Sequence, residues 1–215
     1  MLNEIKTYLD QNNVRLVAVS KTKPVEAIQS IYEQGVKDFG ENRVNELRDK
    51  QPQLPDDIKW HMIGHLQKNK VKYIAPYIHM IHSVDSLELA EKISQQAVRF
   101  DRHINILLQM KIAQEDSKYG YSMENLIADL PTIKALPNLN ICGVMGMGTF
   151  TDDDSVTTQE FKYLIGVFNK LQAEEFQDKD NFKEISMGMS GDYKIAVECG
   201  STMVRIGSLI FGARH

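Results

Sequence analysis

Lys21 is the residue whose type and position most clearly permit chemistry. It follows the segment LVAVS at 16–20 and would therefore stand at the end of a buried strand. An amine attacks an aldehyde only when it is unprotonated, and burial or a nearby cation lowers a lysine pKa enough to supply that form. Lys21 therefore qualifies as a Schiff-base lysine. By position alone, a strand-end lysine that simply reaches solvent is the commoner arrangement.

Two serine and glycine segments near the C-terminus are candidates for anion binding. Ser190 and Gly191 lie in SMGMSG, and Gly207 and Ser208 lie in VRIGS. Glycine lets a backbone N–H approach a phosphate closely, and serine hydroxyls add further donors. Together the four residues fit a phosphate cradle. Turn geometry and strand packing would explain the same residues equally well.

Arg205 is expected to point inward. In TMVRIGS it alternates with apolar neighbours, which directs it into a barrel or toward the barrel mouth. A charged group in that position needs a partner. That partner is either a ligand or, as the alternative, an acidic residue of an adjacent strand that forms a structural ion pair.

The other chemical motifs are weaker. HMIGH places His61 and His65 four residues apart but lacks the glutamate of a zinc-protease motif, so no metal site is expected there. GMSGD has Asp192 where a nucleophile elbow requires glycine, which makes Ser190 a better phosphate donor than nucleophile. The acidic run at 152–154 lacks calcium-loop spacing and is typical of a solvated turn. We expect no catalytic residue among these motifs.

The elements that must position these residues alternate in type along the chain. Short β-rich runs are separated by longer amphipathic segments, the pattern of repeated βα units around a parallel sheet. Eight such runs are found, at 15–21, 37–42, 59–64, 79–84, 104–112, 140–148, 182–189 and 203–211. We therefore predict an α/β fold, a single (β/α)₈ TIM barrel, in one domain over residues 1–215. An open doubly wound sheet is the main alternative, although no GxGxxG follows the first run.

Two helices carry specific expectations. Residues 2–12 form an additional N-terminal helix that could cover the bottom of the barrel. The sixth helix between strands is expected to begin at about Ser155, with the Ser155 hydroxyl as N-cap. Its core-facing residues follow helical spacing: Phe161, Leu164, Ile165, Phe168 and Leu171.

Barrel architecture selects the candidate site. Working groups in this fold lie at the carboxyl ends of the strands, and phosphate is often held by the loops after strands seven and eight. By this rule Lys21 ends the first strand, Ser190 ends the seventh, and Arg205 and Ser208 lie on the eighth.

Composition excludes several other classes of protein. Hydrophobic residues make up 42% and charged residues 25%, which is typical of a globular protein and excludes disordered chains. The net charge of −4 leaves no basic excess for nucleic acid or an anionic membrane surface. Cys142 and Cys199 have neither disulfide-framework nor zinc spacing. Without a secretory signal or membrane span, we expect a cytoplasmic protein.

The motifs in their order resemble one known family. VAVSKTKP, FGENRVNE, WHMIGHLQKNK, HSVDS, SMGMSGDY and GSTMVRIGSLIFGAR look like those of the pyridoxal phosphate homeostasis proteins. The resemblance runs from about residue 15 to the C-terminus. It implies a fold similar to the barrel domain of alanine racemase and pyridoxal 5′-phosphate as cofactor. The residues that it implies for the cofactor are Lys21 as Schiff base, Ser190, Gly191, Gly207 and Ser208 at the phosphate, Arg205 at the pyridine nitrogen, and Asn42 and Met145 at the ring.

The resemblance also implies a role in intracellular vitamin B6 homeostasis without robust catalysis. An arginine at the pyridine nitrogen disfavours the added proton that makes the ring a strong electron sink. The chain is also too short for the second domain that gives alanine racemase its opposing base. We expect a monomer that contacts PLP-dependent enzymes only transiently. A slow racemase, and a barrel that binds a phosphorylated metabolite without a Schiff base, are the alternatives.

Overall fold

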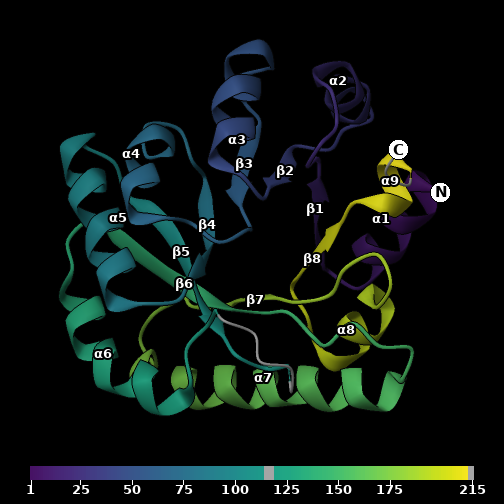
Figure 1. Ribbon diagram of the computed structural model, residues 1–215. Helices are drawn as coiled ribbons and strands as arrows, with labels where there is room; N and C mark the ends of the chain where they lie inside the picture. Colours follow the sequence, from purple (N-terminus) through teal and green to yellow (C-terminus); the bar gives the residue numbers. More distant parts are fainter. Residues whose placement is uncertain (114–118, 213–215) are drawn as a thin grey trace.

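Eight parallel strands close into a barrel in the computed structural model, which describes residues 1–113 and 119–212 (Figure 1). The strands follow one another around the barrel in chain order: β1 Arg15–Val19, β2 Asp38–Glu41, β3 Lys59–Met62, β4 Met80–Val84, β5 Ile104–Met110, β6 Leu139–Gly146, β7 Glu184–Ser186 and β8 Met203–Ile206. Ala18 of β1 pairs with Ile206 of β8, which closes the sheet. The barrel prediction is therefore confirmed, and the open-sheet alternative is wrong.

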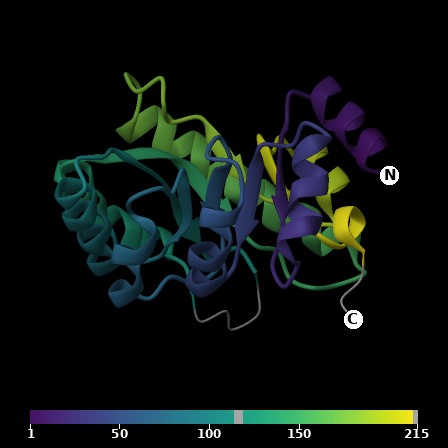
Figure 2. The ribbon, with the colours of Figure 1, turned by 90° about the horizontal axis from the view of Figure 1, so that it is seen from above.

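Helices surround the barrel on the outside (Figure 2). Their bounds are α1 Leu2–Gln11, α2 Val25–Glu33, α3 Val44–Lys50, α4 Val71–Ile74, α5 Leu87–Arg99, α6 Met123–Ala135, α7 Asp154–Glu175, α8 Tyr193–Cys199 and α9 Ser208–Phe211, with 3₁₀ turns at Gln51–Gln53 and Lys68–Lys70. The main apolar core lies between helices and sheet and includes Phe39, Leu47 and Phe161. Within the described ranges, no helix has the length and apolarity to cross a bilayer.

The additional N-terminal helix is present as α1, but it packs along the outside of the barrel and not across its bottom. The Tyr8 ring makes a T-shaped contact with the ring of Tyr193 at the start of α8, with centroids 5.9 Å apart. Lys6 Nζ donates to the carbonyl of Gln34, just beyond α2, at 2.7 Å. The described helix after β8, α9, has only four residues. α1 therefore takes the place in the outer layer between α8 and α2.

The last two strands are shorter than the sequence pattern suggested. β7 ends at Ser186, and although Met187 and Gly188 still hydrogen-bond to β8, Gly188 has a φ of 93° and Ser190 lies in the following loop. β8 ends at Ile206, and Ser208 starts the short helix α9 instead of continuing the strand. The prediction of one strand over 203–211 is wrong. Residues 213–215, which include the end of the last family motif, lie outside the described residues.

The helix expected from Ser155 begins one residue earlier. Asp153 is the N-cap, and its Oδ1 accepts a hydrogen bond from Ser155 N–H at 2.9 Å. A carboxylate accepts this bond well because the helix N-terminus is electropositive. Four of the five predicted core residues are buried, whereas Ile165 is half-buried.

Candidate cofactor-binding site

The carboxyl end of β1 leads into a tight turn that carries Lys21. Ser20 N–H donates to the carbonyl of Gly40 on β2 at 3.0 Å, and Thr22 N–H donates to Oε2 of Glu46 at 2.6 Å. Thr22 has φ of 64°, in the left-handed region that a β-branched residue rarely adopts. These hydrogen bonds fix the backbone on both sides of Lys21, which is half-buried.

A charged cluster, formed by the buried Glu41 and Lys50 and the partly buried Glu46, supports this turn. Lys50 Nζ donates to Glu41 Oε1 at 2.7 Å, to Glu46 Oε2 at 2.9 Å and to the Ser20 carbonyl at 2.9 Å. Ser20 Oγ also donates to Glu41 Oε1, at 2.7 Å. Sequence reasoning missed the cluster. A glutamate in an otherwise buried strand was the available signal, but its partner on α3 could be identified only from the fold.

Glu41 has an unusual electrostatic environment. It is fully buried, and its Oε2 has no hydrogen-bond partner in the described part of the chain. Burial raises the pKa of Glu41 from 4.5 to about 7, although the hydrogen bonds from Lys50 and Ser20 act in the opposite direction. The carboxyl group next to the Lys21 turn therefore exchanges its proton near neutral pH.

The loops after β7 and β8 lie next to the end of β1, because β8 pairs with both β1 and β7. Gly207 N–H donates to Ser190 Oγ at 3.2 Å, which joins the two loops directly. Gly191 and Ser208 are exposed. A Cβ at Gly191 would meet no described atom within 4 Å, so packing does not require glycine there. The structure therefore brings the two predicted phosphate-binding segments together at one end of the barrel.

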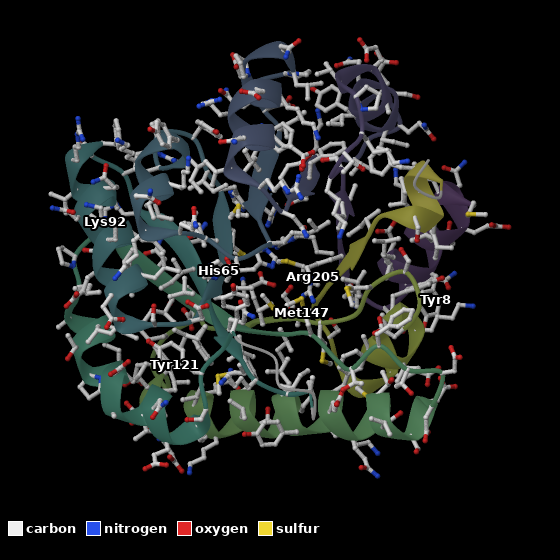
Figure 3. All side chains as sticks on the ribbon, viewed as in Figure 1. Tyr8, His65, Lys92, Tyr121, Met147 and Arg205 are labelled. Carbon is white, nitrogen blue, oxygen red and sulfur yellow. The ribbon has the colours of Figure 1, made fainter. Side chains whose placement is uncertain are left out.

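Arg205 lies inside the barrel near its centre (Figure 3). Its Nη1 donates to Ser186 Oγ at 2.6 Å, and its Nη2 donates to the carbonyl of Gly146 at 2.9 Å. No carboxylate of the described residues lies within ion-pair distance, so the structural ion pair considered as an alternative is not found there. Burial lowers the pKa of Arg205 to about 10, and the nearby charge of Asp192 raises it. Arg205 is thus a buried cation held by neutral acceptors.

Asn42 and Met145 occupy different environments. Asn42 is half-buried just after β2, and Met145 is fully buried in β6, next to the Gly146 carbonyl that holds Arg205. The backbone of Gly64 packs against that of Asn42, since a Cβ at Gly64 would lie 2.4 Å from the Asn42 carbonyl oxygen. The close approach of two backbones therefore requires glycine in the WHMIG segment.

A polar chain runs through the barrel from Arg205 to its opposite end, and sequence reasoning missed it. His82 Nδ1 lies 3.0 Å from Ser186 Oγ, His82 Nε2 lies 2.9 Å from His61 Nδ1, and His61 Nε2 lies 2.9 Å from Asp38 Oδ1. Burial lowers the pKa of both histidines. The signal was a set of polar residues in β2, β3, β4 and β7, but the contact between His82 of β4 and Ser186 of β7 depends on barrel closure.

These features define a class: a parallel (β/α)₈ barrel with a lysine after its first strand and joined serine–glycine loops after its last two. The chain belongs to the alanine racemase N-terminal domain family, whose model matches residues 2–215, and within it to the pyridoxal phosphate homeostasis proteins. The protein of that name from Synechocystis is 40% identical over 207 residues, covering 94% of this chain and 92% of its own. The human protein of that name is 40% identical over 211 residues, covering 93% and 76%.

Solved structures agree with this assignment. PipY of Synechococcus elongatus, without PLP, has a TM-score of 0.92 at 36% identity and covers 98% of both chains. The same protein with PLP bound has a TM-score of 0.89 at 34% identity, covering 99% of this chain and all of its own. Alanine racemase of Clostridium difficile shares the fold, with a TM-score of 0.77 at 16% identity over 55% of its length. The family resemblance drawn from the motifs is confirmed.

Proposed function

We propose that this protein binds pyridoxal 5′-phosphate as a Schiff base on Lys21 and holds it for intracellular vitamin B6 homeostasis. One observation carries the proposal. Lys21 follows β1, Ser190 follows β7, and Arg205 and Gly207 lie on β8 and just after it. These three strands are neighbours in the closed barrel, and Gly207 N–H bonds Ser190. The relative with PLP bound and the names of the curated relatives support this choice of ligand.

The residues present fit this cofactor. An amine at the end of β1 suits an aldehyde, and Ser190, Gly191, Gly207 and Ser208 offer hydroxyl and backbone donors for a phosphate. Asn42 and Met145 are proposed to border the ring. The buried Arg205, which has no carboxylate partner in the described chain, suits an uncharged ring nitrogen as acceptor. When bound, the cofactor supplies a reactive aldehyde and an electron-withdrawing ring.

Storage and release of the cofactor, and not rapid turnover, is the proposed role. A guanidinium stays protonated at physiological pH even with its pKa lowered to about 10. It therefore disfavours a second positive charge on a neighbouring ring nitrogen, which limits the ring as an electron sink. Incubation of loaded protein with single-enantiomer amino acids in deuterated water tests this role. Sustained α-proton exchange at enzyme-like rates would contradict it.

Borohydride reduction followed by peptide mapping tests the attachment site. Reduction converts an imine to a stable secondary amine, so the label should appear on the peptide that contains Lys21. Lys21→Ala should lose the label and keep its circular dichroism spectrum, whereas Lys162→Ala, on the exposed face of α7, should keep both. Lys23 is the nearest competitor, but its Nζ donates to the carbonyls of Phe211 and Gly212 at 3.1 and 3.3 Å. A label on Lys23 would refute the assignment.

We further propose that residues 1–215 act as one unit, as a cytoplasmic monomer that meets PLP-dependent enzymes only transiently. Elements from both ends of the chain, α1 and β8, pack on β1. Cys142 and Cys199 are both free thiols, which suits a reducing compartment. Light scattering during size-exclusion chromatography, with and without a recipient enzyme, tests the monomer and the transient contact.

A further inference from the structure

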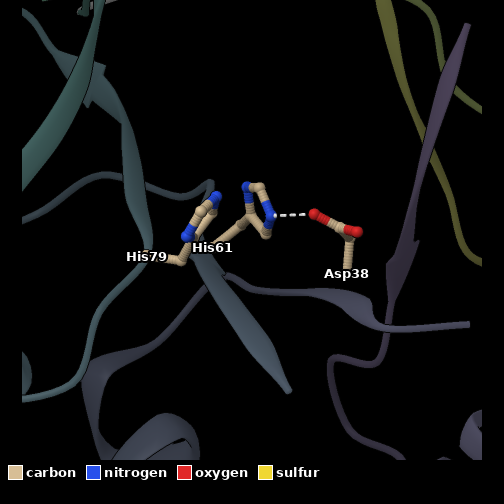
Figure 4. Close-up of side chains that lie close together, drawn as sticks. All are labelled: Asp38, His61 and His79. Atoms are coloured by element: carbon tan, nitrogen blue, oxygen red, sulfur yellow. Dashed lines mark hydrogen bonds and ion pairs between the residues drawn. The ribbon is translucent and has the colours of Figure 1, made fainter. Parts of the chain in front are cut away.

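Asp38, His61 and His79 come together at the amino-terminal end of the barrel, opposite the proposed cofactor site. Asp38 begins β2, His61 lies in β3, and His79 directly precedes β4. Figure 4 shows the three side chains close together, with the hydrogen bond between His61 and Asp38. One oxygen or ring nitrogen from each residue lies within 4.8 Å of the other two. His65, the other histidine of HMIGH, is not part of this group, because its Nδ1 lies 3.5 Å from Oδ2 of Asp85, just beyond β4. The fold thus gives His61 two ligand-bearing neighbours that its own motif does not contain.

Two of the three side chains, Asp38 and His79, have capacity for a further partner, whereas both ring nitrogens of His61 already have one. His61 Nε2 and Asp38 Oδ1 are 2.9 Å apart, while no hydrogen bond of the His79 ring or of Asp38 Oδ2 is found in the described residues. The His79 backbone is fixed, because its N–H donates to the Trp60 carbonyl at 2.9 Å and its carbonyl accepts from Asn105 Nδ2 at 3.1 Å. His61 is fully buried, whereas Asp38 and His79 are partly exposed. An ion would therefore enter from the surface past Asp38 and His79.

The protonation states of the cluster are those that a metal requires. Burial lowers the pKa of His61, and it lowers that of His79 to about 4 together with the neighbouring His61. Burial would raise the pKa of Asp38, but the His61 hydrogen bond and nearby cations bring it below its ordinary value. At neutral pH both imidazoles are therefore uncharged and Asp38 is a carboxylate, and His61 Nε2 offers a lone pair once its proton moves to Nδ1.

We propose that Asp38, His61 and His79 bind a zinc-class divalent ion, with water in the fourth position. Two imidazoles and one carboxylate suit Zn²⁺, Co²⁺ or Ni²⁺ and disfavour Mg²⁺ and Ca²⁺. Metal–ligand bonds of about 2.1 Å in a tetrahedron put ligand atoms about 3.4 Å apart. The Asp38–His61 separation is already close to this spacing, so the ring of His79 needs to move by only on the order of 1 Å. The ion would replace the proton that His61 now donates to Asp38.

This replacement would reverse the polar chain that leads to Arg205. At present a guanidinium, which can only donate, stands at one end, and a carboxylate, which accepts, stands at the other. Ser186 therefore donates to His82, His82 Nε2–H donates to His61, and His61 Nε2–H donates to Asp38. A metal on His61 Nε2 moves the His61 proton to Nδ1 and, in turn, the His82 proton to Nδ1, where it points at Ser186. Because Ser186 Oγ also accepts from Arg205, the change would reach the guanidinium next to the proposed ring site. That consequence rests on the proposed function, whereas the metal site does not.

Cobalt titration of the full chain tests the site. One equivalent of Co²⁺ should bind with the intense visible d–d absorbance of four-coordinate cobalt. His79→Gln and Asp38→Asn should each lower the affinity more than tenfold, since each removes one of three ligands. His103→Gln is the matched control, because His103 is exposed just before β5 at the same end of the barrel, and it should bind as the wild type does. Circular dichroism confirms that each variant is folded.

Two results would overturn the site: only weak absorbance of six-coordinate cobalt, or affinity unchanged in both folded ligand variants. Nitrogen-15 spectra of the histidine rings with Zn²⁺ test the coupling separately. Movement of the His61 and His82 protons to Nδ1 supports the coupling, and unchanged tautomers refute it. Neither measurement depends on cofactor binding, so failure of this proposal and failure of the proposed function remain distinguishable.

Discussion

Replacing Glu41 by Gln should remove a specific pH dependence of stability. Burial raises the pKa of Glu41 from 4.5 to about 7, so the folded state holds its proton more tightly than the unfolded state does. Stability from this group is therefore fully present below pH 4.5 and is lost as the pH rises toward 7. The change in pKa corresponds to roughly 3 kcal/mol over that window. Glutamine keeps an oxygen for Lys50 and Ser20 but cannot titrate.

Urea unfolding between pH 4.5 and pH 8 measures this effect. Between the two limits the wild type should lose roughly 3 kcal/mol more free energy of unfolding than Glu41→Gln does. Comparing changes with pH, and not absolute stabilities, cancels any constant cost of burying the amide group. Glu174→Gln, on the exposed part of α7, is the matched control and should follow the wild type. If wild type and Glu41→Gln changed in parallel within about 1 kcal/mol, Glu41 would have an ordinary pKa and the reasoning would fail.

Three further predictions concern the proposed site. Ser190→Ala combined with Ser208→Ala should weaken retention of the cofactor, since each lost charge-assisted hydrogen bond is worth about 1.5–3 kcal/mol; an unchanged preference for pyridoxal phosphate over pyridoxal would place the phosphate elsewhere. Gly64→Ala should destabilise the fold by about 1–3 kcal/mol in urea unfolding, because the added Cβ would clash with the Asn42 backbone. Gly166→Ala on α7, whose Cβ would meet no atom within 4 Å, should stabilise the fold. Equal effects of the two substitutions would contradict the close approach of Gly64 to Asn42. In loaded protein, Arg205→Glu should increase α-proton exchange of added amino acids more than Arg205→Gln does, and no increase in a folded Glu variant would show that Arg205 does not set the ring electronics.

The spacing of apolar and polar residues predicted much of the fold, because it indicates which side chains point toward the core. Arg205 alternates with apolar neighbours on β8, and the structure places it inside the barrel. Element ends were predicted less well, since they depend on backbone conformation. Gly188, two residues after the end of β7, has a φ of 93°, and a pattern of apolar residues does not reveal such a backbone angle. The N-cap of α7 likewise depended on which of two nearby polar residues, Asp153 or Ser155, accepts the hydrogen bond.

The sequence by itself determined the alternation of strands and helices, the family, and the candidate positions Lys21, Ser190 and Arg205, because these follow from residue types at short spacing along the chain. Only the tertiary structure decided which distant groups meet. Lys50 on α3 bonds Glu41 on β2. The side chain of His61 lies next to those of Asp38 and His79, which come from other parts of the sequence. Hydrogen bonds act over about 3 Å, and only the packing of strands and helices in the folded barrel brings these residues within that distance.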